Sequence, residues 1–304
     1  MSEYGLEIIE KRLKEKLVNE LARTGLLFRL FSRVKEQMSI EEKFGRKVYS
    51  KDTELMQDLI GFRITTYFSD DVKIVVDLCQ KIFSQVELVY DEPSSEVFKP
   101  LRKNMICRMP EHETAIFKEI QPNNPQYGLV DNTFEIQFRT TLSEGWHEVD
   151  HLMRYKCKPE WETLATEGRM LNGIYATLET NDQTLRALFD DIAYQHYKSK
   201  NWEAMLRNKL RLRFTSKKLN YDIINYLNEN TEIGKKIFKL NRHKILNTYI
   251  FSTLMFPVTF DNWICFINYY FLKDEFITSK TQTVLMDEFD LAFNKMNDPN
   301  ILQA

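Results

Sequence analysis

The sequence has few cysteines, and none of them forms a C-x-x-C pair. Its four cysteines are far apart, at Cys79, Cys107, Cys157 and Cys265. This spacing argues against a disulfide framework and against a cysteine zinc site, and it is typical of reduced thiols in the cytosol.

The sequence also lacks a long apolar run and a strong net charge, and we expect no secretory leader. Its most hydrophobic region, residues 245–272, is interrupted by Pro257, Asp261 and Asn262, so we expect buried helices there and no membrane span. The N-terminus is charged and amphipathic, unlike a signal peptide. The formal net charge is −2, so a surface for nucleic acid has to be local. The expected location is the cytoplasm.

The apolar spacing predicts an α+β fold followed by helices. Helical periodicity covers residues 3–22 and 24–38. Runs rich in β-branched and aromatic residues predict strands at 62–68, 86–90, 104–109 and 133–139. Ser69, Asp70 and Asp71 provide capping chemistry for a helix that runs to about residue 83. A turn cluster marks residues 119–131 as a loop.

From residue 142 onward the pattern is helical almost to the end. Residues 209–214 (KLRLRF) alternate in a way that suits a strand as well as a helix. We expect a mixed-sheet domain with N-terminal helices over residues 1–197, and an all-helical domain over residues 198–304.

Two acidic residues stand beside predicted strands. Asp58 precedes the first of these strands, and Glu135 lies inside an otherwise apolar one. Gln137 shares the face of Glu135 because side chains alternate along a strand. A carboxylate inside a strand needs an arginine, a metal or a substrate hydroxyl as partner. Two acids on separate strands suit a magnesium-dependent phosphoryl-type transfer, although Asp58 is equally compatible with a turn or cap.

Cations cluster just ahead of Asp58. They are Arg33, Lys35, Lys43, Arg46 and Lys47. Cations that converge before an acidic strand would neutralise a triphosphate. Taken alone, the cluster is more typical of a solvated basic surface.

Together these segments resemble the RelA/SpoT-type alarmone synthetases, and in particular the small and toxic small members. The resemblance covers roughly residues 25–160. It consists of R-V-K with S-I-x-x-K-x-x-R-K (33–47), D-x-x-G-x-R-I (58–64), and E-I-Q-x-R-T with W-x-x-x-x-H-x-x-x-Y-K (135–156). It implies a nucleotidyltransferase-like mixed sheet flanked by helices. It also implies transfer of the β,γ-pyrophosphate of ATP to the 3′-hydroxyl of GDP or GTP, which yields (p)ppGpp.

The resemblance implies a role for each matching residue. Asp58 and Glu135 would hold Mg²⁺, and Glu135 would alternatively accept the proton of the attacking hydroxyl. Arg63 and Gln137 would complete the catalytic group. ATP would bind to Arg33, Lys35, Lys43, Arg46, Lys47 and Arg139. The acceptor would be framed by His151, Tyr155 and Lys156.

The acceptor loop departs from the family pattern. The family carries Gly-Tyr-Arg-Ser-x-His between the two acidic strands, and its tyrosine stacks on the acceptor guanine. Residues 97–108 here read VFKPLRKNMICR, without that Gly, Tyr or His. Phe98 would stack in place of the tyrosine, and Arg102 and Asn104 would supply polar contacts.

Three alternatives stay open. Some relatives are toxins or phage-defence proteins that modify the 3′ end of tRNA, and residues 198–218 hold eight basic residues against one acid, Glu203, as an RNA-contacting surface would. The altered loop also fits a degenerate nucleotide-binding or interaction protein. Residues 147–151 satisfy H-E-x-x-H, the pattern of zinc metalloproteases. Partners left open are a second copy of the chain and an antitoxin.

Overall fold

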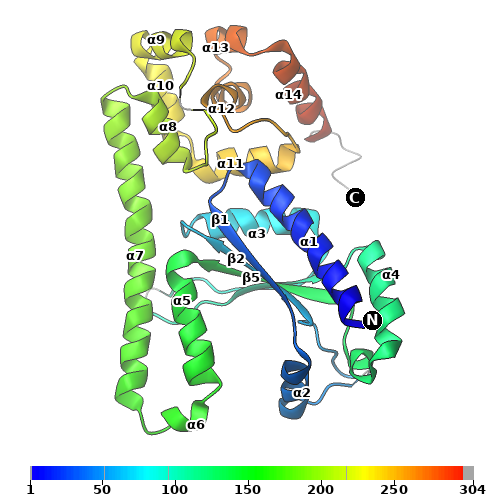
Figure 1. Cartoon of the computed structure of the whole chain (residues 1–304). Coiled ribbons are helices and arrows are strands. Elements are labelled where there is room, and N and C mark those ends of the chain that lie inside the picture. Colours follow the sequence, from blue (N-terminus) through cyan, green and yellow to red (C-terminus); the bar gives the residue numbers. More distant parts are fainter. Residues whose placement is uncertain (1, 51, 95, 217, 297–304) are drawn as a thin grey trace. The chain divides into compact units, whose positions relative to one another are not determined.

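The computed structural model describes residues 2–50, 52–94, 96–216 and 218–296 (Figure 1). The chain forms two compact units. The sheet unit comprises residues up to 19 together with 28–183, and the helical unit comprises residues 20–27 together with those from 184 onward. The predicted domain boundary at 197/198 lies near the end of a helix within which the two units divide. The division into two separate domains at residues 197/198 stays a prediction.

Five strands form one mixed sheet in the sheet unit: β1 (Phe28–Val34), β2 (Ile60–Thr66), β3 (Gln85–Tyr90), β4 (Lys103–Arg108) and β5 (Thr133–Thr140). Their order in space is β1-β2-β5-β4-β3. β2 and β5 run parallel, and every other neighbouring pair runs antiparallel. The expected strands are thus confirmed, with bounds shifted by at most two residues.

Alternation along the central strands gives the sheet one closed face. Phe62 and Ile64 of β2 lie on it with Phe134, Ile136 and Phe138 of β5, and each is at most 1% exposed. Helix α3 (Asp71–Ile82) packs against these two strands. Burying each phenylalanine side chain contributes about 1.5–3 kcal/mol before the entropy of ordering is counted. The opposite face is free to carry polar side chains.

The predicted helix over residues 24–38 is wrong. Helix α1 (Ser2–Thr24) ends at Gly25, whose φ of +74° suits a left-handed helix cap. The chain then enters β1, which pairs with β2 over its full length. Leu26, Leu30 and Val34 are spaced like one face of a helix, but the same segment also alternates, and pairing with β2 decides between the two patterns. Arg33 therefore lies on a strand.

The remaining helices of the sheet unit flank the sheet. They are α2 (Gln37–Arg46), α4 (Glu111–Ile120), α5 (Thr141–Val149), α6 (Lys158–Trp161) and the first part of α7 (Ala165–Lys198). Helix α5 starts at a capping box between Thr140 and Ser143, and it continues as a π-helix over Asp150–Tyr155. The indole of Trp146 donates a hydrogen bond of 2.7 Å to the carbonyl of Leu171, which joins α5 to α7.

The helical unit confirms the predicted helical C-terminal region. It contains α8 (Trp202–Leu210), α9 (Tyr221–Glu229), α10 (Thr231–Lys239), α11 (Arg242–Ser252), α12 (Phe260–Ile267), α13 (Glu275–Lys280) and α14 (Thr283–Met296). Tyr249, Trp263, Phe266 and Phe289 are fully buried and form its aromatic core. Residues 211–214 of the ambiguous KLRLRF segment are neither strand nor helix. Within the described ranges, the helices are all too short or too polar to span a bilayer.

Candidate active site

The open face of the sheet carries a grid of polar side chains. Strand register puts Arg33, Gly61 and Glu135 in one row across β1, β2 and β5. Arg63 and Gln137 occupy the next row, and Asn104 of β4 stands opposite Gln137. These residues come from distant parts of the sequence, and the parallel pairing of β2 with β5 brings them together. The absence of a side chain at Gly61 leaves space beside Glu135.

At the entry to β2, Asp58 binds two lysines. Its Oδ2 accepts a hydrogen bond of 2.6 Å from Lys35, and its Oδ1 accepts one of 2.6 Å from Lys43. Burial alone would raise the pKa of Asp58, but the charges and hydrogen bonds of the two lysines outweigh it and lower that pKa. Burial lowers the pKa of Lys35. The charge of Asp58 and its hydrogen bond to Lys35 act in the opposite direction, but they offset the effect of burial only in part. An anionic ligand would therefore find two ammonium groups held side by side.

Glu135 is oriented by two amide groups. Asn104 donates to its Oε1 and Gln137 donates to its Oε2, each at 2.9 Å. Gln137 in turn accepts a hydrogen bond of 3.1 Å from Nε of Arg63. Arg63 is anchored by Glu144 and Glu148 of α5. This chain of contacts fixes the carboxylate of Glu135 on the open face of the sheet.

Asp58 and Glu135 belong to neighbouring parallel segments but have separate partners. Asp58 precedes Gly61, the residue opposite Glu135, by three positions, and it lies just before β2 begins at Ile60. In the described part of the chain, no three His, Cys, Asp or Glu side chains gather as a metal site. Mg²⁺ commonly takes one or two protein carboxylates together with substrate phosphates and water. The hard oxygen donors of Asp58 and Glu135 fit that mode of binding.

The residues predicted to bind ATP fall into three places. Lys35 and Lys43 meet at Asp58, and Arg33 projects from β1 on the same face of the sheet. Arg46 instead pairs with Glu42 at 2.9 Å, and Lys47 pairs with Glu54 at 2.7 Å, both on the exposed surface. Arg139 lies four residues beyond Glu135 along β5, where it is half-buried.

Among the described residues predicted to frame the acceptor, Asn104 alone forms a hydrogen bond with Glu135. Phe98 is 55% exposed in the loop between β3 and β4. The backbone N–H of Arg102 donates to Asp91 at 2.9 Å. His151, Tyr155 and Lys156 are exposed on or just after the π-helix, where the rings of His151 and Tyr155 stack.

The H-E-x-x-H segment does not form a regular metal-binding helix. Helix α5 ends at Val149, between the two histidines, and the π-helix begins at Asp150. The ring of His147 packs against Trp146 and Tyr175, and burial, followed by the charges of Arg139 and Arg63, lowers the pKa of His147 to about 3. The described residues offer no third donor to this pair.

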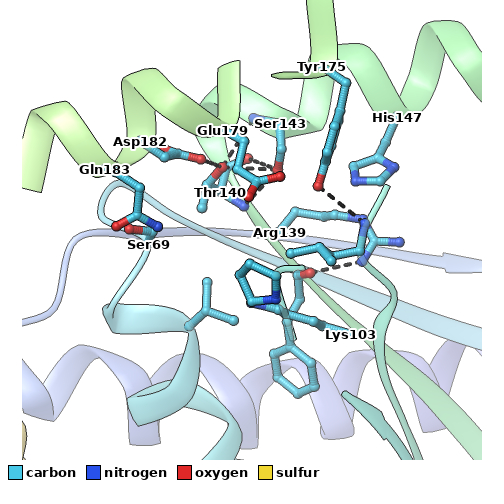
Figure 2. A pocket seen from close by; sticks show the side chains of 14 residues that line it. Ser69, Lys103, Arg139, Thr140, Ser143, His147, Tyr175, Glu179, Asp182 and Gln183 are labelled. Atoms are coloured by element: carbon cyan, nitrogen blue, oxygen red, sulfur yellow. Dashed lines mark hydrogen bonds between the residues drawn. The ribbon is translucent and has the colours of Figure 1, made fainter. Parts of the chain in front are cut away.

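A cavity of about 70 Å³ opens where β5 ends and α7 passes (Figure 2). Tyr175, Glu179 and Asp182 reach it from α7, and Lys103 and Arg139 reach it from the sheet. Sequence reasoning missed the three residues on α7. Their spacing of four and then three positions puts them on one face of a helix, and that pattern would have identified them as a group.

The basic segment 198–218 is not one exposed surface. Lys209 donates to the carbonyls of Phe238 and Leu240 at 2.6 Å, and its burial lowers its pKa to about 8. The side chain of Arg211 is 2% exposed. Lys198, Lys200, Arg207, Arg213 and Lys218 are exposed, and Lys217 lies outside the described residues. RNA contact through this segment stays a prediction.

Residues 32–160 match the family model described as "Region found in RelA / SpoT proteins". The matched region contains Asp58, Glu135 and the contacts that orient them, and it ends before α7 begins. No curated protein matches the chain at a significant level.

Solved structures are similar to about three fifths of the chain. The crystal structure of the small alarmone synthetase 1 from Bacillus subtilis is 22% identical, with a TM-score of 0.45, over 62% of this chain and 91% of that one. A GTP pyrophosphokinase family protein from Streptococcus pneumoniae is 18% identical, with a TM-score of 0.42, over 62% and 90%. The small alarmone synthetase 2 from Bacillus subtilis is 20% identical, with a TM-score of 0.44, over 62% and 93%.

Proposed function

We propose that the RelA/SpoT domain formed by residues 32–160 transfers the β,γ-pyrophosphate of ATP to the 3′-hydroxyl of a guanine nucleotide. The observation that carries this proposal is the pairing of β2 with β5. It puts a doubly lysine-bound carboxylate, Asp58, and a carboxylate oriented by amides, Glu135, on adjacent parallel segments. Phosphoryl-type transfer depends mainly on alignment and charge neutralisation, and this arrangement would supply both.

The lysines give the donor side its chemistry. ATP phosphates would compete with Asp58 for the ammonium groups of Lys35 and Lys43, since both are anionic partners of the same cations. That exchange would leave the oxygens of Asp58 open to a divalent cation. Mg²⁺ bound to the phosphates, with Asp58 as its protein ligand, would neutralise charge on the transferring group. Arg33 adds a further cation on the same face of the sheet.

Glu135 is the proposed base for the acceptor hydroxyl. As the 3′-oxygen bonds to the β-phosphorus, the bond between the α–β bridging oxygen and the β-phosphorus breaks, and AMP leaves with that oxygen. The hydroxyl proton passes to the carboxylate of Glu135. Asn104 and Gln137 hold that carboxylate in place before and after the transfer, and such orientation lowers the barrier by limiting reorganisation.

The test is transfer from ATP labelled at the γ-phosphate. Purified protein with Mg²⁺ is given GDP, GTP or bulk tRNA, and the label is followed into each acceptor. We expect label on the guanine nucleotide. Label found only on RNA would show that tRNA, and not a guanine nucleotide, is the acceptor. Retention of all label in ATP, with ATP still raising the melting temperature, would indicate a nucleotide-binding protein without transferase activity.

A further inference from the structure

The cavity at the end of β5 contains a buried carboxylate with one oxygen unused. Asp182 of α7 is 5% exposed. Its Oδ2 accepts a hydrogen bond of 2.6 Å from Thr140, while its Oδ1 is buried and has no hydrogen-bond partner among the described residues. Burying a carboxylate oxygen without a donor is costly. Figure 2 shows the Asp182 side chain on α7 directed toward Thr140 among the residues that line the cavity.

A half-buried ammonium group accompanies this carboxylate. Lys103 of β4 lines the same cavity, and its Nζ lies over the ring of Tyr90, 4.7 Å from the ring centroid. Burial lowers the pKa of Lys103, and the acids Glu92, Glu179 and Asp182 offset this in part. The cavity therefore presents a strong acceptor and a strong donor that the protein leaves for a ligand.

We propose that Asp182 and Lys103 recognise the Watson–Crick edge of a guanine base. Guanine places its N1–H and 2-amino donors next to its O6 acceptor. The carboxylate of Asp182 would accept from the two donors, and the ammonium group of Lys103 would donate to O6. Adenine places an unprotonated N1 where guanine has N1–H, so it would leave Asp182 facing a lone pair. Neither the family match nor its motifs assign Asp182, which lies beyond residue 160.

This assignment rests on the proposed function, because it makes the cavity the acceptor subsite. Arg139 lines the cavity four residues beyond Glu135 on β5, about 13 Å along the strand. Lys103 and Thr140 alternate with Asn104 and Arg139 along their strands, so the base would lie at the end of the sheet, and its ribose would reach Glu135 past Arg139, which shares the open face with Glu135. Asn104 lies between the two places, since it donates to Glu135 and accepts from Arg139 at 3.4 Å. The cavity thus replaces the aromatic stacking that the altered 97–108 loop lacks.

An Asp182→Asn variant tests the assignment by reversing one hydrogen bond. The asparagine oxygen keeps the bond from Thr140, and its amide turns an acceptor into a donor. Binding of GDP, xanthosine diphosphate (XDP) and ADP is measured by calorimetry with and without a non-hydrolysable ATP analogue. We expect wild type to prefer GDP. The variant should bind GDP about 10- to 100-fold more weakly and should gain relative affinity for XDP, whose C2 carbonyl accepts a hydrogen bond.

Matched variants complete the test. Asp191→Asn, at an exposed position of the same helix, should leave the GDP-to-XDP ratio unchanged. Lys103→Met should weaken both nucleotides about tenfold without changing that ratio, and Lys99→Met in the exposed loop should change neither.

Several results would overturn the assignment: an unchanged GDP-to-XDP ratio in Asp182→Asn, equal binding of ADP and GDP by wild type, or no nucleotide binding. An unchanged ratio together with intact transfer to GDP would remove the subsite and leave the proposed function standing. A changed GDP-to-XDP ratio in Asp182→Asn, in a protein that transfers no pyrophosphate, would support the guanine subsite and contradict the proposed function.

Discussion

The ammonium group of Lys35 lies 2.6 Å from Oδ2 of Asp58, at the point where the chain enters β2. Lys43 binds the other oxygen of the same carboxylate at the same distance. One acid thus holds two cations at the edge of the parallel β2–β5 pair. On the proposed account, this cluster is the phosphate-binding end of the site and Glu135 is its chemical end.

Replacing Asp58 with asparagine should reduce pyrophosphate transfer at least about 100-fold, because a neutral amide neither binds Mg²⁺ well nor balances two lysines. The steady-state rate with ATP and GDP is the measurement. Asp52→Asn, at an exposed position just upstream, is the control and should behave as wild type. An Asp58→Asn rate within about threefold of wild type would remove Asp58 from the mechanism.

Replacing Glu135 with glutamine should lower kcat by about 10²- to 10⁴-fold, the usual contribution of a general base. Its effect on ATP binding should be small, because Lys35 and Lys43 are unchanged. Single-turnover kinetics separate the two quantities. Glu87→Gln, on an exposed position of β3, serves as the control. A loss of ATP affinity with an unchanged rate of transfer would show that Glu135 acts in donor binding instead.

Arg63→Lys should lower kcat by about tenfold while the protein stays folded. A lysine cannot hold Gln137 and the two carboxylates of α5 at once as the guanidinium does. Gln137 would then orient Glu135 less well. Arg29→Lys is the matched control, since Arg29 lies on the same face of the sheet and contacts Tyr67. Equal kinetics for the two variants would contradict the positioning role of Arg63.

Asp182→Asn should make the protein more stable at pH 8. Burial raises the pKa of Asp182 to about 6 from an ordinary value of 3.8. The ionised carboxylate therefore opposes folding: the penalty is absent below the ordinary value, grows between the two values and is complete above about 6. Removing the charge should add about 2 kcal/mol to the free energy of unfolding at pH 8, and less toward pH 4. Denaturant unfolding at both pH values measures it, and an equal gain at both would contradict this account.

The sequence predicts those parts of the site that depend on local patterns. Glu135 and Gln137 lie in one short strand whose alternation already fixes the face they share, and the structure brings Gln137 to Glu135 as expected. Arg46 and Lys47 look equivalent to Lys43 in sequence. Their ion pairs with Glu42 and Glu54 draw them away from Asp58, and such pairing depends on how the chain folds around them.

Two features could not be predicted for different reasons. β1 is a half-buried edge strand, so its apolar spacing satisfies a helix and a strand equally, and only the pairing with β2 resolves it. Asp182 lies on a long helix whose composition resembles any solvated helix. Its burial follows from the packing of α7 against the end of β5, a contact that joins residues 42 positions apart.

The most direct test of the central claim follows both phosphates of the donor at once. ATP carrying label on the β-phosphate in one sample and on the γ-phosphate in another is incubated with GDP and Mg²⁺. The account predicts that both labels move to GDP in equal amounts, with one AMP formed per transfer. Release of ADP, or movement of the γ-label alone, would contradict it.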